Sequence, residues 1–310
     1  MSADCLVTGG AGFIGSHLVE QLVRDGRRVR VVDNLCTGFR RNLATVAQDV
    51  EFIEGALEDP TVAERAVAGV EVVFHQAALP SVPRSVQDPF TSQRCGEVAT
   101  LTLLHAAARA GVRRVIYASS SSIYGDTPTL PKVETMPPRP LSPYAATKLA
   151  GEGYMAAYAA LSGMDTLCLR YFNVFGPRQD ATSQYAGVIA KFVAVMTRGE
   201  RPTIYGDGTA TRDFTPVANV VAANLLAMTA SGRFQGDVFN IACGRRISIM
   251  MLVEQLNRLL GTSLAPIYAP PRPGDIAHSL ADIDKARRVL GYDPTVTFEE
   301  GLRELVAMHR

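Results

Sequence analysis

Three glycines at three-residue spacing follow the first apolar run of the chain. Gly9 and Gly12 follow that run, at residues 5–7, and Gly15 lies at the start of a stretch of helical apolar spacing at residues 13–24. A strand that turns tightly into a helix in this way opens a βαβ unit. This local order restricts the chain to folds in which helices cover a parallel sheet.

The same alternation continues through the first half of the chain. Further strands are predicted at residues 29–32, 52–53, 70–74, 115–118 and 166–169, and helices at residues 62–68, 97–110 and 144–161. The strands are almost continuously apolar, which is typical of a parallel sheet buried on both faces. The predicted fold class is therefore α/β, a Rossmann-type doubly wound parallel sheet.

The alternation breaks after about residue 173. Glycine, proline and aromatic residues punctuate residues 175–208, residues 265–274 are proline-rich, and helices are predicted at residues 217–230, 249–260, 282–290 and 298–309. A strand-like run at residues 238–241 is expected to return to the sheet. We predict two domains: residues 1–172 with 213–241 form the sheet domain, and residues 173–212 with 242–310 form a smaller, mostly helical C-terminal lobe.

Charge and cysteine content exclude several classes of protein. The 31 Lys and Arg residues are balanced by 30 Asp and Glu residues, so no strong basic field exists and no nucleic acid partner is expected. The five cysteines form no Cys-x-x-Cys pair, which indicates reduced packing residues rather than disulfides. The five histidines have no partners at ligand spacing, so no metal is predicted.

Two further features concern membranes. The first residues have neither a basic segment nor an apolar leader, so no signal peptide is indicated. The uncharged stretch at residues 214–232 contains Pro216, Asn219 and Asn224, and we predict a core helix there rather than a membrane span. We expect a cytoplasmic protein without a membrane partner.

The glycine segment also predicts a binding site. Its glycines permit close approach of a pyrophosphate to the backbone, and the N-terminus of the following helix attracts that anion. Asp33 ends the second predicted strand 18 residues after Gly15, where an acid accepts a ribose 2′-hydroxyl and repels a 2′-phosphate. The pattern favours NAD over NADP. Arg40 and Arg41 could serve a 2′-phosphate, but solvated positions are the preferred interpretation.

The middle of the chain contains a second group of polar residues that could form a site. Serines 119–122 follow the strand at residues 115–118, and ligands bind at the carboxyl ends of strands in such sheets. Tyr144 and Lys148 are four residues apart and share one helix face. The ammonium and a bound nicotinamide cation would favour the phenolate, so Tyr144 could act as a base near neutral pH.

These residues belong to longer segments with a recognisable pattern. The segments are TGGAGFIGSHL, VVDNLCTG, FHQAALPSVPRSVQDP, ASSSSIYGD, SPYAATKLAGE, LRYFNVFGPRQ, YGDGTATRDF and RPGDIAHSLADIDKA. Through them the chain resembles the extended short-chain dehydrogenase/reductase family. Within that family it resembles the NAD-dependent nucleotide-sugar 4-epimerases, most closely those of UDP-N-acetylglucosamine, over nearly its whole length. The resemblance implies a retained NAD and a homodimer that pairs the helices at residues 97–110 and 144–161.

The resemblance implies a catalytic role for three residues. Tyr144 would take the proton of the C4 hydroxyl while C4 passes hydride to NAD, and Ser120 would hydrogen-bond the reacting oxygen. Lys148 would hold the nicotinamide ribose and lower the pKa of the tyrosine. The 4-keto sugar would then turn and receive hydride on its other face. The residues expected to contact NAD are Gly9, Gly12, Phe13, Ile14, Gly15, Asp33, Asn34, Thr37, Gly38, Leu57, Gln76, Ala77, Ala78, Tyr144, Lys148 and Tyr171.

The C-terminal lobe is expected to bind a UDP sugar. By the same resemblance Arg212 and Arg272 would bind the diphosphate, and Asp275 would contact the uridine ribose. The expected substrate contacts are Ser81, Arg84, Ser85, Ser121, Asn173, Phe192, Tyr205, Arg212, Arg272, Asp275 and Ser279. Ser279 stands where members restricted to UDP-glucose have a bulky tyrosine. Room for the 2-acetamido group of UDP-GlcNAc and UDP-GalNAc is therefore expected.

Sister reactions and departures from the family leave alternatives open. The resemblance implies that dehydratases and decarboxylases of the family carry acids in the two positions after Ser120. This chain has Ser121 and Ser122 there, and neither titrates near neutral pH. Epimerisation, which needs no additional acid or base, is therefore favoured. Ser119 and Ser122 are interpreted as a polar strand end.

Two positions depart from the family pattern. Ala56 replaces an acid near adenine, and Gly96 replaces an asparagine at a position where glycine lowers helix stability by about 1 kcal/mol. The alternatives are a modifier of UDP-uronic acids and a non-catalytic NAD-binding regulator.

Overall fold

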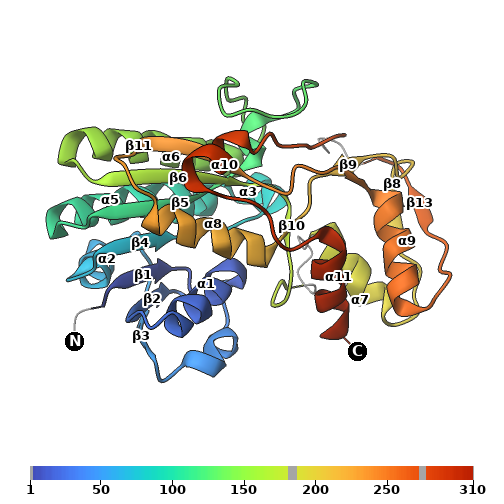
Figure 1. The fold of residues 1–310 in the computed structure, drawn as a ribbon, viewed down its shortest axis with the longest axis horizontal. Coiled ribbons are helices and arrows are strands. Elements are labelled where there is room, and N and C mark those ends of the chain that lie inside the picture. Colours follow the sequence, from blue (N-terminus) through green and yellow to red (C-terminus); the bar gives the residue numbers. More distant parts are fainter. Residues whose placement is uncertain (1–2, 181–186, 272–276, 310) are drawn as a thin grey trace.

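Seven parallel strands form the centre of the molecule (Figure 1). The computed structural model describes residues 3–180, 187–271 and 277–309. The strands are β1 (Cys5–Thr8), β2 (Val29–Asp33), β3 (Val50–Glu54), β4 (Val72–His75), β5 (Arg114–Ser120), β6 (Asp165–Tyr171) and β11 (Gln235–Ile241). Their order is β11-β6-β5-β4-β1-β2-β3, and all neighbours are parallel. The chain order reverses between β4 and β1, and doubly wound sheets bind ligands at the carboxyl ends of the strands at such a point.

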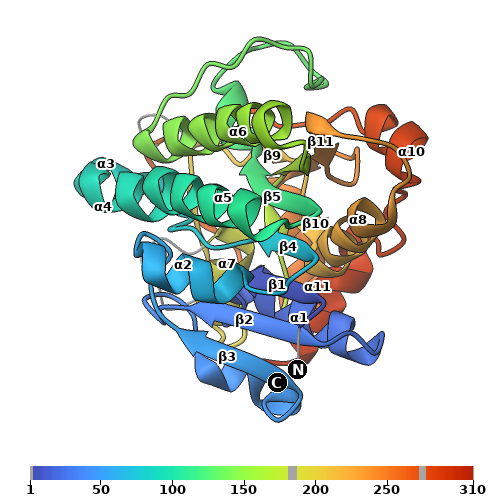
Figure 2. The same cartoon turned by 90° about the vertical axis from the view of Figure 1, so that its left-hand side faces the viewer.

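Helices cover both faces of this sheet (Figure 2). One face carries α1 (Phe13–Arg24), the 3-10 helix η1 (Arg40–Val46), α8 (Val217–Thr229) and α10 (Asp284–Leu290), and the other carries α2 (Pro60–Val67), α5 (Ala99–Ala110) and α6 (Pro143–Ser162). Phe74 and Ile116 enter the core of the first face, and their neighbours Val73 and Val115 enter the core of the second. Successive residues of a strand point to opposite faces, so an unbroken apolar strand supplies both cores.

A smaller lobe follows on one side of the sheet domain (Figure 1). It contains α7 (Val188–Met196), α9 (Ile249–Leu260) and α11 (Phe298–Ala307), with the strand pairs β7 (Val174–Phe175) and β10 (Thr215–Pro216), β8 (Thr203–Tyr205) and β13 (Ile267–Ala269), and β9 (Thr211–Arg212) and β12 (Ile247–Ser248). Its core includes Phe175, Phe214 and Phe298, whose ring centroids lie 5.7 to 6.3 Å apart. Helix α7 was not predicted, because its nearly unbroken apolar run shows no helical period.

Helical structure begins further upstream than the apolar pattern of the helix predicted at residues 97–110 indicates. Before α5 come α3 (Val82–Gln87), α4 (Pro89–Gln93) and the π-helical turn η2 (Arg94–Val98). Side chains of Ser81 and Asp88 cap the first two, each with a proline in the first turn. The returning strand at residues 238–241 is confirmed as part of β11, which pairs in parallel with β6. Within the described residues, no helix is long and apolar enough to cross a bilayer.

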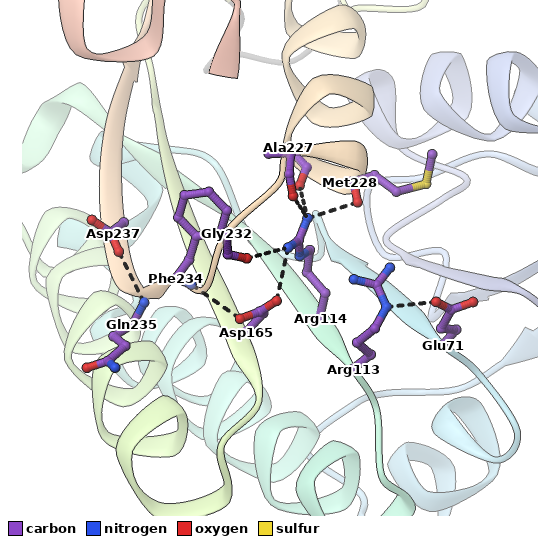
Figure 3. Close-up of polar contacts among 11 residues, drawn as sticks. Glu71, Arg113, Arg114, Asp165, Ala227, Met228, Gly232, Phe234, Gln235 and Asp237 are labelled. Carbon is purple, nitrogen blue, oxygen red and sulfur yellow. Dashed lines mark hydrogen bonds and ion pairs between the residues drawn. The ribbon is translucent and has the colours of Figure 1, made fainter. Parts of the chain in front are cut away.

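A buried arginine at the start of β5 joins the sheet to α8 (Figure 3). The Arg114 guanidinium donates to the carbonyls of Ala227, Met228 and Ala230 at 2.8 to 3.0 Å and to Asp165 at 2.9 Å. Arg114 and Asp165 are also register partners in β5 and β6. The cation therefore neutralises both a carboxylate and the negative end of a helix.

We expect Arg114→Met to lower the free energy of unfolding by about 3 kcal/mol, because it leaves the Asp165 carboxylate without its buried partner. Urea unfolding followed by circular dichroism measures this change. Arg113→Met is the matched control, since the pair of Arg113 with Glu71 has side chains 47% and 60% exposed and stabilises little. Equal losses in the two variants would contradict this role of Arg114.

Candidate active site

The glycine turn between β1 and α1 has the geometry that the sequence predicts. Gly9 has φ +65°, and a Cβ there would lie 2.8 Å from the Cα of Ala77. A Cβ on Gly15 would lie 2.2 Å from the carbonyl oxygen of Gly9. The residue before α1, Gly12, supplies no side-chain cap to the helix. The turn is therefore a close-packed cradle in front of the uncapped N-terminus of α1, which suits an anion.

Asp33 stands at the end of β2, beside this turn. Its buried carboxylate accepts hydrogen bonds from the N–H groups of Ala11 at 3.0 Å and Leu35 at 2.8 Å. Burial raises the pKa of Asp33, and the two N–H donors act in the opposite direction. The carboxylate is thus held against the glycine turn, at the position where the fingerprint expects the acid.

The two arginines that follow Asp33 have partners of their own. Arg40 pairs with Glu54 at 2.8 Å, and its guanidinium carbon lies 4.2 Å from the ring centroid of Phe52. The Arg41 guanidinium carbon lies 4.0 Å from the ring centroid of Phe39. Both arginines are exposed, which agrees with the preferred interpretation of them as solvated residues.

The structure brings the three predicted catalytic residues together. Ser120 is the last residue of β5, Tyr144 is the second residue of α6, and Lys148 follows one turn later. The Ser120 side chain is close enough to the Tyr144 phenol to act against the rise in the pKa of that phenol. The ammonium nitrogen of Lys148 lies 5.9 Å from the centroid of the Tyr144 ring and donates to the carbonyl of Ala118 at 2.6 Å. Helix α6 starts here because the Ser142 side chain caps it and a proline follows.

Burial dominates the protonation of this group. Loss of hydration lowers the pKa of Lys148 to about 7, against the opposing influence of Glu152 and Cys168. Burial raises the pKa of Tyr144, and the Ser120 side chain acts against that rise. The structure thus differs from the expectation of a lowered tyrosine pKa, because burial outweighs the effect of Ser120 on the phenol. A bound cation beside the phenol would act in the opposite direction.

Two of the four serines have partners that the sequence did not reveal. The N–H and the hydroxyl of Ser122 both donate to the Oγ of Ser120, at 3.2 and 2.9 Å. The hydroxyl of Ser119 donates to Glu152 at 2.6 Å. Both serines thus have hydrogen-bond partners within the protein, and their interpretation as a polar strand end stays a prediction. A single sequence holds no signal that separates them, since all four serines follow the same strand.

A cleft in the smaller lobe collects four of the residues predicted to contact substrate. It has a volume of about 1130 Å³, and its walls include Asn173 after β6, Phe192 of α7, Tyr205 of β8 and Arg212 of β9. The guanidinium of Arg212 donates to the carbonyl of Thr211 at 2.9 Å, which fixes it at the wall. Aromatic rings beside a guanidinium suit a nucleotide base and its phosphates.

Ser279 lies beside this cleft. Its N–H donates to the carbonyl of Thr211 at 3.0 Å, and its hydroxyl is 3.5 Å from the amide nitrogen of Asn173. The preceding residue, His278, lines the cleft. Arg272 and Asp275, which are also expected to contact substrate, lie outside the described residues.

The residues expected on the sugar side lie on α3 and after β5. The Ser81 side chain accepts the N–H of Arg84 at 3.1 Å as the cap of α3. Ser85 is buried, and its hydroxyl donates to the carbonyl of Val82 at 2.7 Å. Ser121 begins the short 3-10 helix η3 (Ser121–Tyr124). Contact of these residues with a sugar remains a prediction.

A buried carboxylate beside the cleft was not predicted. Asp213 is fully buried and accepts hydrogen bonds from the N–H groups of Cys243 at 3.1 Å and Ala281 at 3.2 Å. Its carbonyl accepts the side-chain amide of Asn173 at 3.1 Å. Burial raises the pKa of Asp213 to about 6, against these N–H donors. Asp213 joins segments far apart in the chain next to Arg212, and no local pattern identifies such partners.

Comparison with known proteins extends this geometry. The model of the NAD dependent epimerase/dehydratase family matches residues 5–242. The chain belongs to this family. A solved UDP-glucose 4-epimerase of Thermotoga maritima, with UDP-glucose, has a TM-score of 0.94 and 41% identity over 99% of this chain and 98% of that chain. A UDP-N-acetylglucosamine 4-epimerase of Methanobrevibacter ruminantium, with UDP-N-acetylmuramic acid, has a TM-score of 0.94 and 40% identity over the same shares. A UDP-glucose 4-epimerase of Thermus thermophilus, with NAD, has a TM-score of 0.88 and 38% identity over 98% of each chain.

The family depends on NAD, and the described residues fit that cofactor. Asn34, Thr37 and Gly38 follow β2, Leu57 follows β3, and Gln76, Ala77 and Ala78 follow β4, all at the carboxyl ends of their strands. Tyr171 ends β6, and its hydroxyl accepts hydrogen bonds from Asn224 at 2.8 Å and from Gln76 at 3.1 Å. The glycine cradle, in which a Cβ would meet backbone atoms, completes a site for a dinucleotide.

Gly96 lies in the π-helical turn η2 rather than in a regular helix. A Cβ there would lie 2.8 Å from the hydroxyl of Thr147, next to Lys148 on α6. The Thr100 hydroxyl donates to the Gly96 carbonyl at 2.5 Å and contacts His75 at 2.9 Å. The expected loss of helix stability therefore does not apply, because the close packing of η2 on α6 leaves no space for a side chain.

The histidines have structural partners. His75 is fully buried between Thr8 at 2.8 Å and Thr100 at 2.9 Å, and burial lowers its pKa to about 3. His17 contacts the carbonyl of Pro177 at 3.0 Å. In the described part of the chain, no group of three or more His, Cys, Asp and Glu side chains could hold a metal ion.

Proposed function

We propose that the protein is an NAD-dependent UDP-sugar 4-epimerase that interconverts UDP-GlcNAc and UDP-GalNAc, and also UDP-glucose and UDP-galactose, through a 4-keto intermediate. The observation that carries this proposal is that Ser120, at the end of β5, and Lys148, one turn along α6, both lie beside the Tyr144 phenol. The η3 turn after Ser120 contains no carboxylic acid. Dehydration or decarboxylation would need an additional acid or base there, whereas epimerisation does not.

The chain's own groups move one proton. When bound, NAD supplies a site that accepts hydride from C4 and returns it. The Tyr144 oxygen takes the proton of the C4 hydroxyl as the C4–H bond breaks, and Ser120 donates a hydrogen bond to the same reacting oxygen. Lys148 stabilises the phenolate by its charge. The proton returns to O4 when hydride returns to C4, so the overall reaction is redox-neutral.

The cleft in the smaller lobe supports the second half of the reaction. Arg212 would bind the diphosphate, and Tyr205 and Phe192 would hold the base, so the nucleotide stays fixed while the sugar turns. Binding energy placed on the part of the substrate that does not react can position the part that does. The 4-keto sugar then presents its other face to the cofactor.

The small side chain of Ser279 supports the proposal that acetamido sugars are substrates. We expect Ser279→Tyr to lower kcat/KM for UDP-GlcNAc about a hundredfold and that for UDP-glucose only a few-fold, because the ring would occupy the space of the acetamido group. Steady-state kinetics on both sugars measure this ratio. Ser279→Ala, which adds no volume, is the control, and it should change neither value more than a few-fold. An equal loss on both sugars in Ser279→Tyr would contradict the role of Ser279 in selection.

Proton NMR of purified protein with UDP-GlcNAc, without added NAD, tests the proposed reaction. Appearance of the anomeric signal of UDP-GalNAc at a fixed ratio would support both the chemistry and a retained cofactor. Conversion of UDP-glucose alone would overturn the acetamido preference. Conversion of UDP-glucuronate alone would favour the uronic acid alternative, and no conversion of any sugar with added NAD would favour a non-catalytic regulator.

We also infer a homodimer from the outer surface of α3 to α5. Val86 on α3 and Phe90 on α4 are 64% and 81% exposed, and Val98 and Leu101 follow on η2 and α5. Clustered exposed apolar residues mark interaction surfaces. Sedimentation velocity should give a dimer for the wild type and a monomer for Phe90→Glu. Val289→Glu, at a 45% exposed position of α10 on the opposite face of the sheet, should remain a dimer, and a monomeric wild type would overturn the inference.

A further inference from the structure

A buried carboxylate lies under the catalytic residues. Glu152 follows Lys148 by one turn on α6, and its side chain is only 7% exposed. It accepts three hydrogen bonds, two from the guanidinium of Arg170 at 2.7 and 2.8 Å and one from the hydroxyl of Ser119 at 2.6 Å. A buried carboxylate with a bidentate arginine and a hydroxyl is fully partnered and rigid.

These bonds attach α6 to the end of β5. Ser119 and Arg170 are register partners in β5 and β6, so the carboxylate is anchored to two strands at once. Ser119 lies between Ser120 and Ala118, the residue whose carbonyl receives Lys148. Two hydrogen bonds, one turn apart on the helix, therefore set how far the serine hydroxyl stands from the groups on α6.

The arginine extends the same network to the turn after Ser120. Its guanidinium carbon lies 4.6 Å from the ring centroid of Tyr124, the last residue of η3. The Tyr124 hydroxyl donates to Asn240 of β11 at 2.7 Å. Arg170 therefore packs against the η3 turn, which also carries Ser122, a hydrogen-bond donor to Ser120.

The carboxylate also sets the charge near the lysine. The titratable and charged groups around the Lys148 ammonium are Tyr144 and Glu152 on α6, Tyr117 on β5, His75 on β4, and Cys168 and Arg170 on β6. Burial raises the pKa of Tyr117 and of Cys168 and lowers that of His75, so these groups are neutral near neutral pH. Glu152 therefore is the anion of this set, and it opposes the loss of charge that burial imposes on Lys148.

We propose that Glu152 is a positioning residue of the active site, which holds Ser120 against Tyr144 and Lys148 through Ser119 and Arg170 and keeps Lys148 charged. This inference rests on the proposed function for its kinetic test, because it assigns the charge of Lys148 a part in epimerisation. Glu152 itself acts through other residues and needs no contact with substrate.

The variant Glu152→Gln, loaded with NAD, tests the proposal. We expect kcat to fall about tenfold to a hundredfold with KM unchanged, because small misplacements of catalytic groups have effects of this size. The charge lost at Glu152 lowers the pKa of Lys148, so the ammonium disappears at lower pH. The alkaline limb of the kcat profile should therefore move to lower pH. Glu152→Asp, which keeps the charge, should restore the limb and recover only part of kcat.

The second buried pair between β5 and β6 provides the control. Asp165→Asn breaks the bond to Arg114 at the opposite ends of the same strands, and should lower stability without moving the pH profile. An unchanged kcat and alkaline limb in Glu152→Gln would overturn the proposal, as would an equal movement of the limb in Asp165→Asn.

Ser119→Ala keeps the buried ion pair between Glu152 and Arg170, so it serves as the test variant if Glu152→Gln does not fold. Its kcat should fall without movement of the limb, and a wild-type kcat would overturn the positioning role.

A titration without substrate separates this proposal from the proposed function. The chain has four lysines, so ¹⁵N NMR of lysine-labelled protein is readable, and comparison with Lys148→Met identifies the Lys148 signal. In NAD-loaded Glu152→Gln, Lys148 should lose its proton at lower pH than in the wild type, because the neighbouring negative charge is gone. The same pH in both would overturn the electrostatic role of Glu152 even if epimerisation is found. If no UDP sugar reacts, the proposed function fails, and this titration still decides the role of Glu152.

Discussion

Tyr144→Phe is expected to lower kcat at least a thousandfold while UDP-sugar and NAD binding change no more than about threefold. The substitution removes the oxygen that would take the O4 proton, and general acid–base groups contribute about 10² to 10⁴ in rate. It leaves the aromatic ring in place at the start of α6. The loss should therefore appear in the chemical step rather than in binding or folding.

Rapid-mixing absorbance of enzyme-bound NADH, together with NMR of turnover, measures this loss. Tyr154→Phe is the control, because Tyr154 is also on α6 but its hydroxyl donates to Glu97 at 3.1 Å. It should retain wild-type turnover. A Tyr144→Phe variant with substantial turnover would contradict the proposed mechanism and would assign the proton transfer to another group.

Strong local signals explain where the sequence predicted the fold well. The helices predicted at residues 13–24 and 249–260 match α1 and α9 from end to end. Each begins beside a glycine turn or a capping serine and has clear helical apolar spacing, so the local pattern alone defines its ends. The parallel sheet followed from apolar strands that alternate with such helices.

Tertiary contacts explain where the prediction fell short. Helix α7 lies in the smaller lobe and is apolar on several faces, so only its surroundings distinguish it from a strand or loop. The π-helical turn η2 exists where Gly96 packs against Thr147 of α6. Neither contact partner is close in sequence, and no local spacing announces either feature.

The residues of the site divide in the same way, into those that local spacing predicts and those that depend on distant partners. Tyr144 and Lys148 are one helical turn apart, and Ser120 ends a strand, so spacing and a family pattern identified all three. Glu152 and Asp213 escaped prediction, although they are buried beside the candidate residues. Their partners come from other strands and loops, and a charged letter in a sequence does not reveal whether its side chain is buried or paired.

Gly15→Ala is expected to weaken NAD binding about a hundredfold, which corresponds to about 3 kcal/mol. The new Cβ would lie 2.2 Å from the carbonyl oxygen of Gly9 and 2.9 Å from the Cα of Gly10, and both are backbone atoms that cannot rotate away. The turn must open, and the first amides of α1 then no longer converge on the place of the pyrophosphate.

Calorimetric titration of NAD into protein stripped of cofactor measures this change. Gly153→Ala on α6 is the matched control, because no atom lies within 4 Å of a Cβ built there, and NAD should bind as it does to the wild type. The same comparison separates two meanings of the glycine spacing. A Gly15→Ala protein that folds but loses NAD would show that the third glycine serves the cofactor. A protein that keeps NAD with wild-type affinity would show that the turn tolerates a wider form, and that Asp33 and the helix N-terminus suffice for binding.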